Sequence, residues 1–81
     1  MNRERRKRVQ KALELLQQAT EILAEVADQE DEAFDNMPES IQESERGEKM
    51  EEILEALDEA MDGIDGIAED LRDACDLKER R

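Results

Sequence analysis

Residues 35–44 read DNMPESIQES and divide the chain into two long segments of helical periodicity. Pro38 cannot donate the backbone hydrogen bond that a continuing helix needs, and it disfavours helical geometry in the preceding residue, so a helix ends just before it. The next helix begins at Ser40, which fits a capping box with Glu43, or at Ser44, and both starts remain open. The predicted elements are a helix over about 3–35, a turn over 36–44 and a second helix over about 45–77.

The apolar residues of the first segment recur on three positions of a seven-residue repeat. They are Val9, Leu16, Leu23 and Met37 on one position, Ala12, Ala19, Val26 and Ala33 on the next, and Leu13, Ala27 and Phe34 on the third. Two apolar positions in seven form a narrow coiled-coil seam, whereas three, widened by Leu15 and Ile22, suit a helical bundle. We therefore expect all three positions to face inward.

The second segment repeats this pattern more regularly. Its positions hold Met50, Leu57, Ile64 and Leu71, then Ile53, Ala60, Ile67 and Ala74, then Leu54, Met61, Ala68 and Cys75. Gly63 and Gly66 interrupt no apolar position, although each weakens a helix interior by about 1 kcal/mol relative to alanine. They mark a soft point or a close contact.

The fold class that follows is all-α, with two long antiparallel helices forming a helical hairpin in a single domain over 1–81. At 1.5 Å per residue, each helix would be about 50 Å long. A lone hairpin leaves much of its wide apolar stripe in water. We therefore expect a second copy to pack against it, giving a homodimeric four-helix bundle.

The residues needed for several kinds of chemistry are missing from the sequence. There is no histidine and Cys75 is the single cysteine, so one chain offers neither an internal disulfide nor a Cys/His zinc site. Cys75 lies on the apolar repeat and is interpreted as a small core residue. We expect no enzyme activity and no cofactor, and, because no long apolar run is present, a cytoplasmic protein that does not enter membranes.

Charge is segregated along the chain. The net charge is −13, with +5 over residues 1–13, −20 over 14–76 and +2 over 77–81, so a hairpin would carry a basic tip and an acidic shaft. Solubility alone can explain such an acidic shaft. A charge of −20 over about 50 Å is also close to duplex DNA, which has one charge per about 1.7 Å, and this favours nucleic-acid mimicry. A third reading is that the basic tip binds nucleic acid or an anionic membrane surface.

Two acidic patterns suggest metal sites. Asp58, Asp62 and Glu69 fit positions 1, 5 and 12 of a calcium-binding loop, but Ala60 stands at position 3, where a ligand is expected. The string EExxE of Glu51, Glu52 and Glu55 occurs in helical magnesium-dependent pyrophosphohydrolases, whose acids converge inward. In the present register these acids point outward, so we expect no metal site.

The stretch DEAFDNMPESIQESERGEKMEE over 31–52 and the basic start RERRKRVQKALELL over 3–16 resemble a group of short acidic helical proteins from phages and mobile elements of Gram-positive bacteria. The resemblance spans nearly the whole chain, and MPESIQESERGEKMEE is its most specific part. It implies a setting in which small acidic proteins inhibit host nucleases, restriction systems or CRISPR effectors.

These observations lead to the hypothesis of a phage-type binding protein that inhibits a host nucleic-acid-binding or defence protein through a DNA-mimicking surface. The partner would be a host protein with a basic surface, and no direct contact with nucleic acid is expected. The alternative is a structural or adaptor protein, such as a virion component or an assembly chaperone. The candidate partner-binding residues are Glu48, Glu51, Glu52, Glu55, Asp58, Glu59, Asp62 and Asp65.

Overall fold

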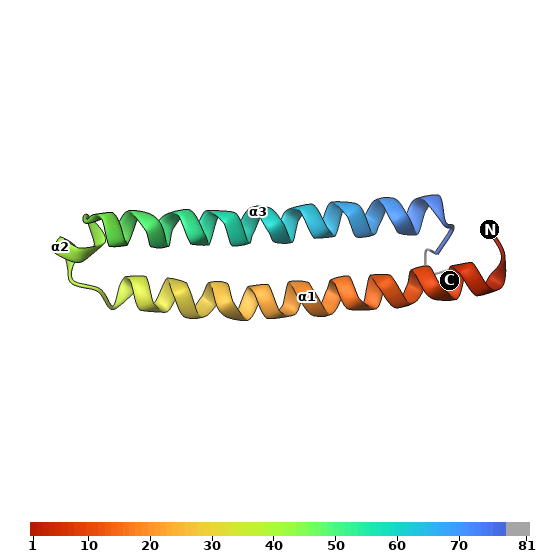
Figure 1. The fold of residues 1–81 in the computed structure, drawn as a ribbon, viewed down its shortest axis with the longest axis horizontal. Coiled ribbons are helices and arrows are strands. Elements are labelled where there is room, and N and C mark those ends of the chain that lie inside the picture. The colour runs from red at the N-terminus through yellow and green to blue at the C-terminus, as the bar shows by residue number, and fades with distance from the viewer. Residues whose placement is uncertain (78–81) are drawn as a thin grey trace.

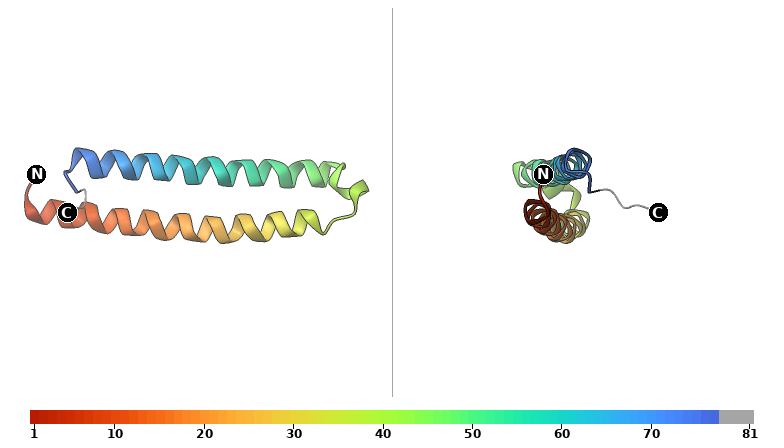
Figure 2. Two further views of the ribbon diagram at one scale, coloured as in Figure 1. Left: turned by 180° about the vertical axis from the view of Figure 1, so that it is seen from behind. Right: turned by 90° about the vertical axis from the view of Figure 1, so that its right-hand side faces the viewer.

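The computed structural model describes residues 1–77, so residues 78–81 of the domain expected over 1–81 lie outside the described residues. Its elements are α1 (Arg3–Asp35), α2 (Glu39–Gln42) and α3 (Glu45–Ala74). The long helices α1 and α3 lie side by side and antiparallel, and the short α2 joins them at one end (Figures 1 and 2). The molecule is a rod of 57 × 22 × 16 Å. The all-helical hairpin predicted from the sequence is confirmed.

Helix α1 has the bounds that the sequence predicts. At its start the side-chain oxygen of Asn2 accepts a hydrogen bond of 2.9 Å from the backbone N–H of Arg5, which satisfies one of the free donors of the first turn. At its end the backbone N–H of Asn36 donates to the carbonyl oxygen of Glu32 at 3.0 Å, and Pro38 follows two residues later.

The turn contains one more helical element than was predicted. Ser40 lies inside α2 and caps nothing, because α2 begins after Pro38. Ser44 is the N-cap residue of α3. Its hydroxyl donates a hydrogen bond to the carbonyl oxygen of Ile41 and accepts none from the backbone N–H groups of α3. The turn is fastened to α1 by Gln42, whose side-chain amide donates a 2.8 Å hydrogen bond to the carbonyl oxygen of Phe34.

Helix α3 ends three residues earlier than predicted. The N–H of Leu77 donates to the carbonyl oxygen of Arg72 at 2.8 Å and that of Asp76 to Asp73 at 3.3 Å. Asp76 has a φ of 56°, so these bonds form the left-handed closing turn known as the Schellman motif. This turn usually contains glycine, and the sequence places aspartate there, so the periodic pattern gives no signal for the stop.

The core is a seam of two residues in every seven, spaced alternately by three and four. In α1 the seam residues are Val9, Leu13, Leu16, Thr20, Leu23, Ala27, Glu30 and Phe34; in α3 and its C-cap they are Gly47, Met50, Leu54, Leu57, Met61, Ile64, Ala68, Leu71 and Cys75. All are buried or half-buried; Leu13, Gly47 and Ala68 are buried, with Leu13 at 7% and Ala68 at 5% exposure. This is the packing of a two-stranded coiled coil.

The expectation that a third apolar position also faces inward is wrong for the single chain. Ala12, Val26 and Ala33 of α1 are exposed, as are Ile53 and Ile67 of α3. Two helices can cover only the stripe that each turns toward the other, and a third row needs a further surface. A Cβ atom added at Gly63 or Gly66 would meet nothing within 4 Å outside its own stretch of helix, so neither glycine marks a close contact, and α3 continues through both without a break.

Candidate functional site

The two sides of the hairpin carry different kinds of side chain, and a residue's side depends on whether it follows or precedes a seam residue. Two grooves between α1 and α3 open on one side: one of about 410 Å³ is lined by Gln17, Asp65 and Arg72, among others, and one of about 280 Å³ is lined by Asp28, Asp31 and Asp58. Each of these residues directly follows a seam residue. Residues that follow the seam therefore share one side of the hairpin, and residues that precede the seam share the other.

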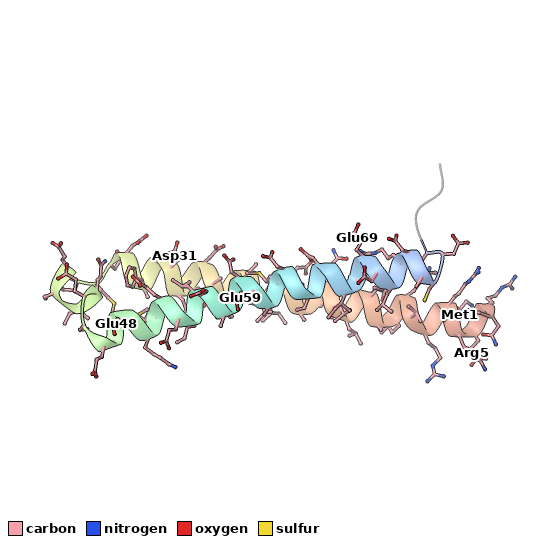
Figure 3. The ribbon with its side chains drawn as sticks, turned by 90° about the horizontal axis from the view of Figure 1, so that it is seen from above. Met1, Arg5, Asp31, Glu48, Glu59 and Glu69 are labelled. Atoms are coloured by element: carbon pink, nitrogen blue, oxygen red, sulfur yellow. The ribbon has the colours of Figure 1, made fainter. Side chains whose placement is uncertain are left out.

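The side that follows the seam is rich in carboxylates. We call the acidic face the twelve helical Asp and Glu that directly follow a seam residue. They are Glu14, Glu21, Asp28, Asp31 and Asp35 of α1, and Glu48, Glu51, Glu55, Asp58, Asp62, Asp65 and Glu69 of α3, all of them exposed. In Figure 3, Asp31 of α1 and Glu69 of α3 point to the same long edge, while Arg5 lies toward the opposite edge.

The carboxylates of the acidic face have little local compensation. Glu14 lies 3.8 Å from the ammonium of Lys11, in a pair in which both side chains are about two-thirds exposed. Such a pair contributes little to stability because water and salt screen it. Within residues 1–77 the other carboxylates of the acidic face lie beyond ion-pair distance of any basic side chain. Their charge is therefore available to an outside partner.

The spacing of these charges is close to that of a nucleic acid. The acidic-face residues run from position 14 to 35 on α1 and from 48 to 69 on α3. Each row is about 32 Å long, so twelve carboxylates give one charge per about 2.6 Å. Duplex DNA has one charge per about 1.7 Å. The charges also form two rows along a rod, as phosphates do.

The eight candidate residues predicted on α3 do not all lie on this face. Six of them do, whereas Glu52 and Glu59 lie one step further around α3, on its outer side. Glu52 is paired there with Lys49 at 3.5 Å, and Glu59 projects over the front of α3 in Figure 3. The acids of α1 that share the face were missed. Each of them directly follows a seam residue of α1, but two of these seam residues, Thr20 and Glu30, are polar, and the sequence does not show which of the three repeat positions forms the seam.

The acids do not gather as a metal site. In the part of the chain that the structure describes, no three His, Cys, Asp or Glu side chains are placed to hold an ion together. The proposed calcium loop over 58–69 is continuous helix within α3. Glu51, Glu52 and Glu55 are exposed and point away from the seam, as the register predicts.

The opposite side is largely apolar, with Arg8, Gln29, Arg46, Lys49 and Asp70 as the polar residues among those that precede the seam. We call the apolar face the Ala, Gly, Val, Leu and Ile residues that directly precede a seam residue. They are Ala12, Leu15, Ala19, Ile22, Val26 and Ala33 of α1, and Ile53, Ala56, Ala60, Gly63, Ile67 and Ala74 of α3. Leu15, Ile22 and Ile67 are 53%, 59% and 56% exposed. Ala19 is half-buried and the other residues of the apolar face are exposed, so this face is a candidate interaction surface.

Basic residues lie at both ends of the apolar face. Arg5 and Arg8 line a groove of about 430 Å³ at the tip, together with Val9 and Ala12. Arg46 and Lys49 hold the corresponding positions near the turn. Neither α1 nor α3 carries the uninterrupted apolar stretch that crossing a bilayer requires, over the residues described.

Comparison with protein-family models, with curated proteins and with solved structures finds no match to this chain. The fold and its two faces define the class: a two-helix coiled-coil hairpin with an acidic face on one side and an apolar face on the other.

Proposed function

We propose that this chain is a non-catalytic binding protein whose acidic face occupies the basic, nucleic-acid-binding surface of another protein. The observation that carries the proposal is the sorting of charge by side. Seven carboxylates of α3 and five of α1 lie on one side, whereas the positions that precede the seam hold twelve Ala, Gly, Val, Leu and Ile residues and one carboxylate, Asp70. A charge pattern that served solubility alone would not need so unequal a distribution of carboxylates between the two sides.

The proposed mode of action is competition with nucleic acid. Two rows of charge along a rod of 57 Å offer a basic groove the electrostatic features of a phosphate backbone. The carboxylates are held by helices, so their order is fixed before binding and little conformational entropy is lost. The resemblance to short acidic proteins of phages and mobile elements suggests a host nuclease, restriction enzyme or CRISPR effector as the target.

The apolar face supports a second part of the proposal, a homodimer in the form of a four-helix bundle. Exposed Leu15, Ile22 and Ile67 would lose their contact with water if a second copy packed against them. The acidic faces would then lie on the two outer sides of the bundle, because each is opposite the apolar face of its own chain. Dimerisation therefore leaves the proposed binding surface free.

The proposal is tested by capture on the immobilised full chain from a bacterial lysate at about 50 mM salt, where exposed charges are weakly screened. Duplex DNA is then added, and the released proteins are identified by mass spectrometry. We expect nucleic-acid-binding proteins to be released by DNA and by high salt. Release of nothing by either treatment would contradict the proposal.

Two double variants of equal net charge test whether the capture depends on the acidic face. Asp58→Lys with Asp65→Lys reverses two carboxylates of the acidic face, whereas Glu43→Lys with Asp70→Lys reverses two exposed acids outside it. We expect the first variant to lose the captured proteins and the second to retain them. Equal loss in both would show that net charge, and not the acidic face, carries the binding.

A second candidate is a structural or adaptor protein, and the exposed apolar face favours it. Such a protein would bind its partner through Leu15, Ile22 and Ile67, and high salt would leave the complex intact or strengthen it. Copurification with virion particles at high salt, lost on substitution of Ile22 or Ile67, would support this candidate over the first.

A further inference from the structure

The start of α1 carries a dense cluster of basic side chains. We call the basic tip the six Lys and Arg of residues 1–13, which are Arg3, Arg5, Arg6, Lys7, Arg8 and Lys11, all of them exposed. Glu4 is the only carboxylate in this stretch, so its net charge is +5. The adjacent end of α3 over 70–77 adds three carboxylates and Arg72, which leaves this end of the hairpin at +3.

Most cations of the basic tip lack a partner in the described part of the chain. The ammonium group of Lys11 lies 3.8 Å from the carboxylate of Glu14. Within residues 1–77, the other five basic side chains of the tip lie beyond ion-pair distance of any carboxylate. Their charge is therefore available to an anionic partner.

Neither helix stability nor solubility explains these cations. The N-terminal end of a helix has a partial positive charge, so anionic side chains stabilise it and cationic side chains oppose it. Arg3, Arg5 and Arg6 nevertheless stand within the first four residues of α1. The basic tip also reduces the magnitude of a net charge that is −13 for the whole chain, so it does not add to solubility. A local preference that is broken without gain in stability is expected where residues serve function.

The basic tip also departs from the sorting of side chains by side that holds along the rest of the hairpin. Counted by the seven-residue repeat, Lys7 is in phase with the acidic face, Arg8 with the apolar face and Arg6 with the seam. In Figure 3, side-chain nitrogens project from both edges of the rod at the end that holds Met1 and Arg5. Cations therefore surround α1 at its start.

This stretch of α1 projects from the rod. Helix α1 extends past the end of α3 (Figures 1 and 2), and the seam begins only at Val9. The helical stretch over 3–8 is about 9 Å long and, with its side chains, about 10–12 Å wide. The major groove of B-form DNA is about 12 Å wide and about 8.5 Å deep, and it has a phosphate backbone on each side. A projecting helix with cations all around it suits such a groove, whereas a flat anionic membrane would meet only one side of the helix.

We propose that the basic tip binds duplex DNA through its phosphates, with the projecting start of α1 in the major groove. In this orientation the acidic face points away from the duplex, because it begins at Glu14, about 9 Å along α1 from Arg8, and continues toward the turn. At about 100 mM salt the Debye length is about 10 Å, so most of the repulsion between these carboxylates and the phosphates is screened.

This inference replaces the expectation, drawn from the sequence, that the chain makes no direct contact with nucleic acid. It goes beyond the proposed function, in which the acidic face binds a basic protein. The two surfaces are separate, so both can be occupied at once.

Fluorescence anisotropy of a short labelled DNA duplex of mixed sequence tests the inference on the purified full chain. We expect saturable binding at about 100 mM salt with a dissociation constant on the order of 10⁻⁵ M, as for other sequence-independent phosphate contacts. An RNA duplex of the same sequence should bind more weakly, because its major groove is deep and narrow.

Two double variants of equal net charge assign the binding to the basic tip. Arg3→Gln with Lys7→Gln removes two cations of the tip, whereas Arg46→Gln with Lys49→Gln removes two exposed cations near the turn. We expect the first variant to weaken DNA binding by at least about tenfold and to lower the salt dependence by about two phosphate contacts. The second should leave both nearly unchanged. The melting temperature of the first variant should not fall, because both side chains are exposed and Arg3 opposes the helix dipole.

Absence of binding to the DNA duplex, or equal weakening in the two variants, would overturn the inference. Tighter binding to the RNA duplex, or to vesicles of phosphatidylcholine and phosphatidylserine, would overturn it as well. No partner protein is present in this assay, so its result is independent of capture through the acidic face. Failure to bind DNA would leave the proposed function intact, whereas capture that survives reversal of Asp58 and Asp65 would refute the proposed function and retain the inference.

Discussion

Gly47 lies directly against the backbone of Gln42, so close that a Cβ atom on Gly47 would collide with the carbonyl group of Gln42 and stand 2.7 Å from its Cα. The contact packs the first turn of α3 beneath α2, and Gly47 is one of the few buried residues of the chain. The hairpin closes at this point because a residue without a side chain stands there.

Replacing Gly47 with alanine should therefore open the turn. We expect Gly47→Ala to destabilise the fold by about 1–3 kcal/mol, since backbone atoms cannot move aside as a flexible side chain would. Gly66→Ala is the matched control: an added Cβ atom would meet nothing within 4 Å outside its own stretch of helix, so the added helix propensity should stabilise the fold by up to about 1 kcal/mol. Urea unfolding of both variants checks the opposite signs, and stabilisation by Gly47→Ala would contradict the contact.

The hydrogen bond from Gln42 to Phe34 should contribute to the same closure. Removing its donor in Gln42→Ala is expected to cost about 1 kcal/mol. Gln18→Ala removes the same amide from an exposed position of α1 and should leave unfolding nearly unchanged. If the two variants unfold at the same urea concentration, the bond does not hold the turn.

Leu13 belongs to the seam and Leu15, two residues later, belongs to the apolar face. Leu13 is 7% exposed and Leu15 is 53% exposed. We expect Leu13→Ala to destabilise folding by about 2–3 kcal/mol at every protein concentration, because it opens a cavity between the helices. Leu15→Ala should mainly weaken the dimer, so its effect on thermal unfolding should depend on concentration. A concentration-independent loss from Leu15→Ala would place Leu15 in the core of the single chain.

A charge in the middle of the apolar face should separate the two copies. We expect Ile22→Glu to yield a helical monomer in sedimentation equilibrium, because pairing would bury an uncompensated carboxylate. Gln18→Glu adds the same charge outside both faces and should leave the dimer intact. The monomeric variant should still bind the captured partner. Loss of that binding as well would mean that the partner requires the dimer.

Most of the fold could be predicted from the sequence, because the decisive features are local. The three-and-four spacing of apolar residues gave the two helices, and Pro38 gave the end of α1. Two boundaries were missed for physical reasons. Helix α2 depends on a fit between Gly47 and Gln42 that no periodicity encodes. Helix α3 ends at Ala74 because Asp76 adopts left-handed geometry, and an aspartate does not indicate that geometry in the sequence as a glycine does.

The candidate site was predicted less completely. The sequence located the acids of α3, but it did not show which acids of α1 stand beside them, since this depends on which of three apolar positions forms the seam. The burial of Leu13 and Ala68 shows which positions form the seam. The residue after each seam position then lies on the side of the acidic face, and the residue before it lies on the side of the apolar face. The three apolar positions of the repeat also include residues of the core and residues of the exposed apolar face, and hydrophobicity alone does not distinguish the two.

The most direct test of the central claim, that the acidic face acts as a substitute for nucleic acid, is the salt dependence of the dissociation constant for a captured basic partner. We expect a dissociation constant that rises steeply between about 50 and 200 mM salt, with a smaller slope for Asp58→Lys with Asp65→Lys than for Glu43→Lys with Asp70→Lys. A dissociation constant that does not change with salt, or equal slopes for the two variants, would contradict it.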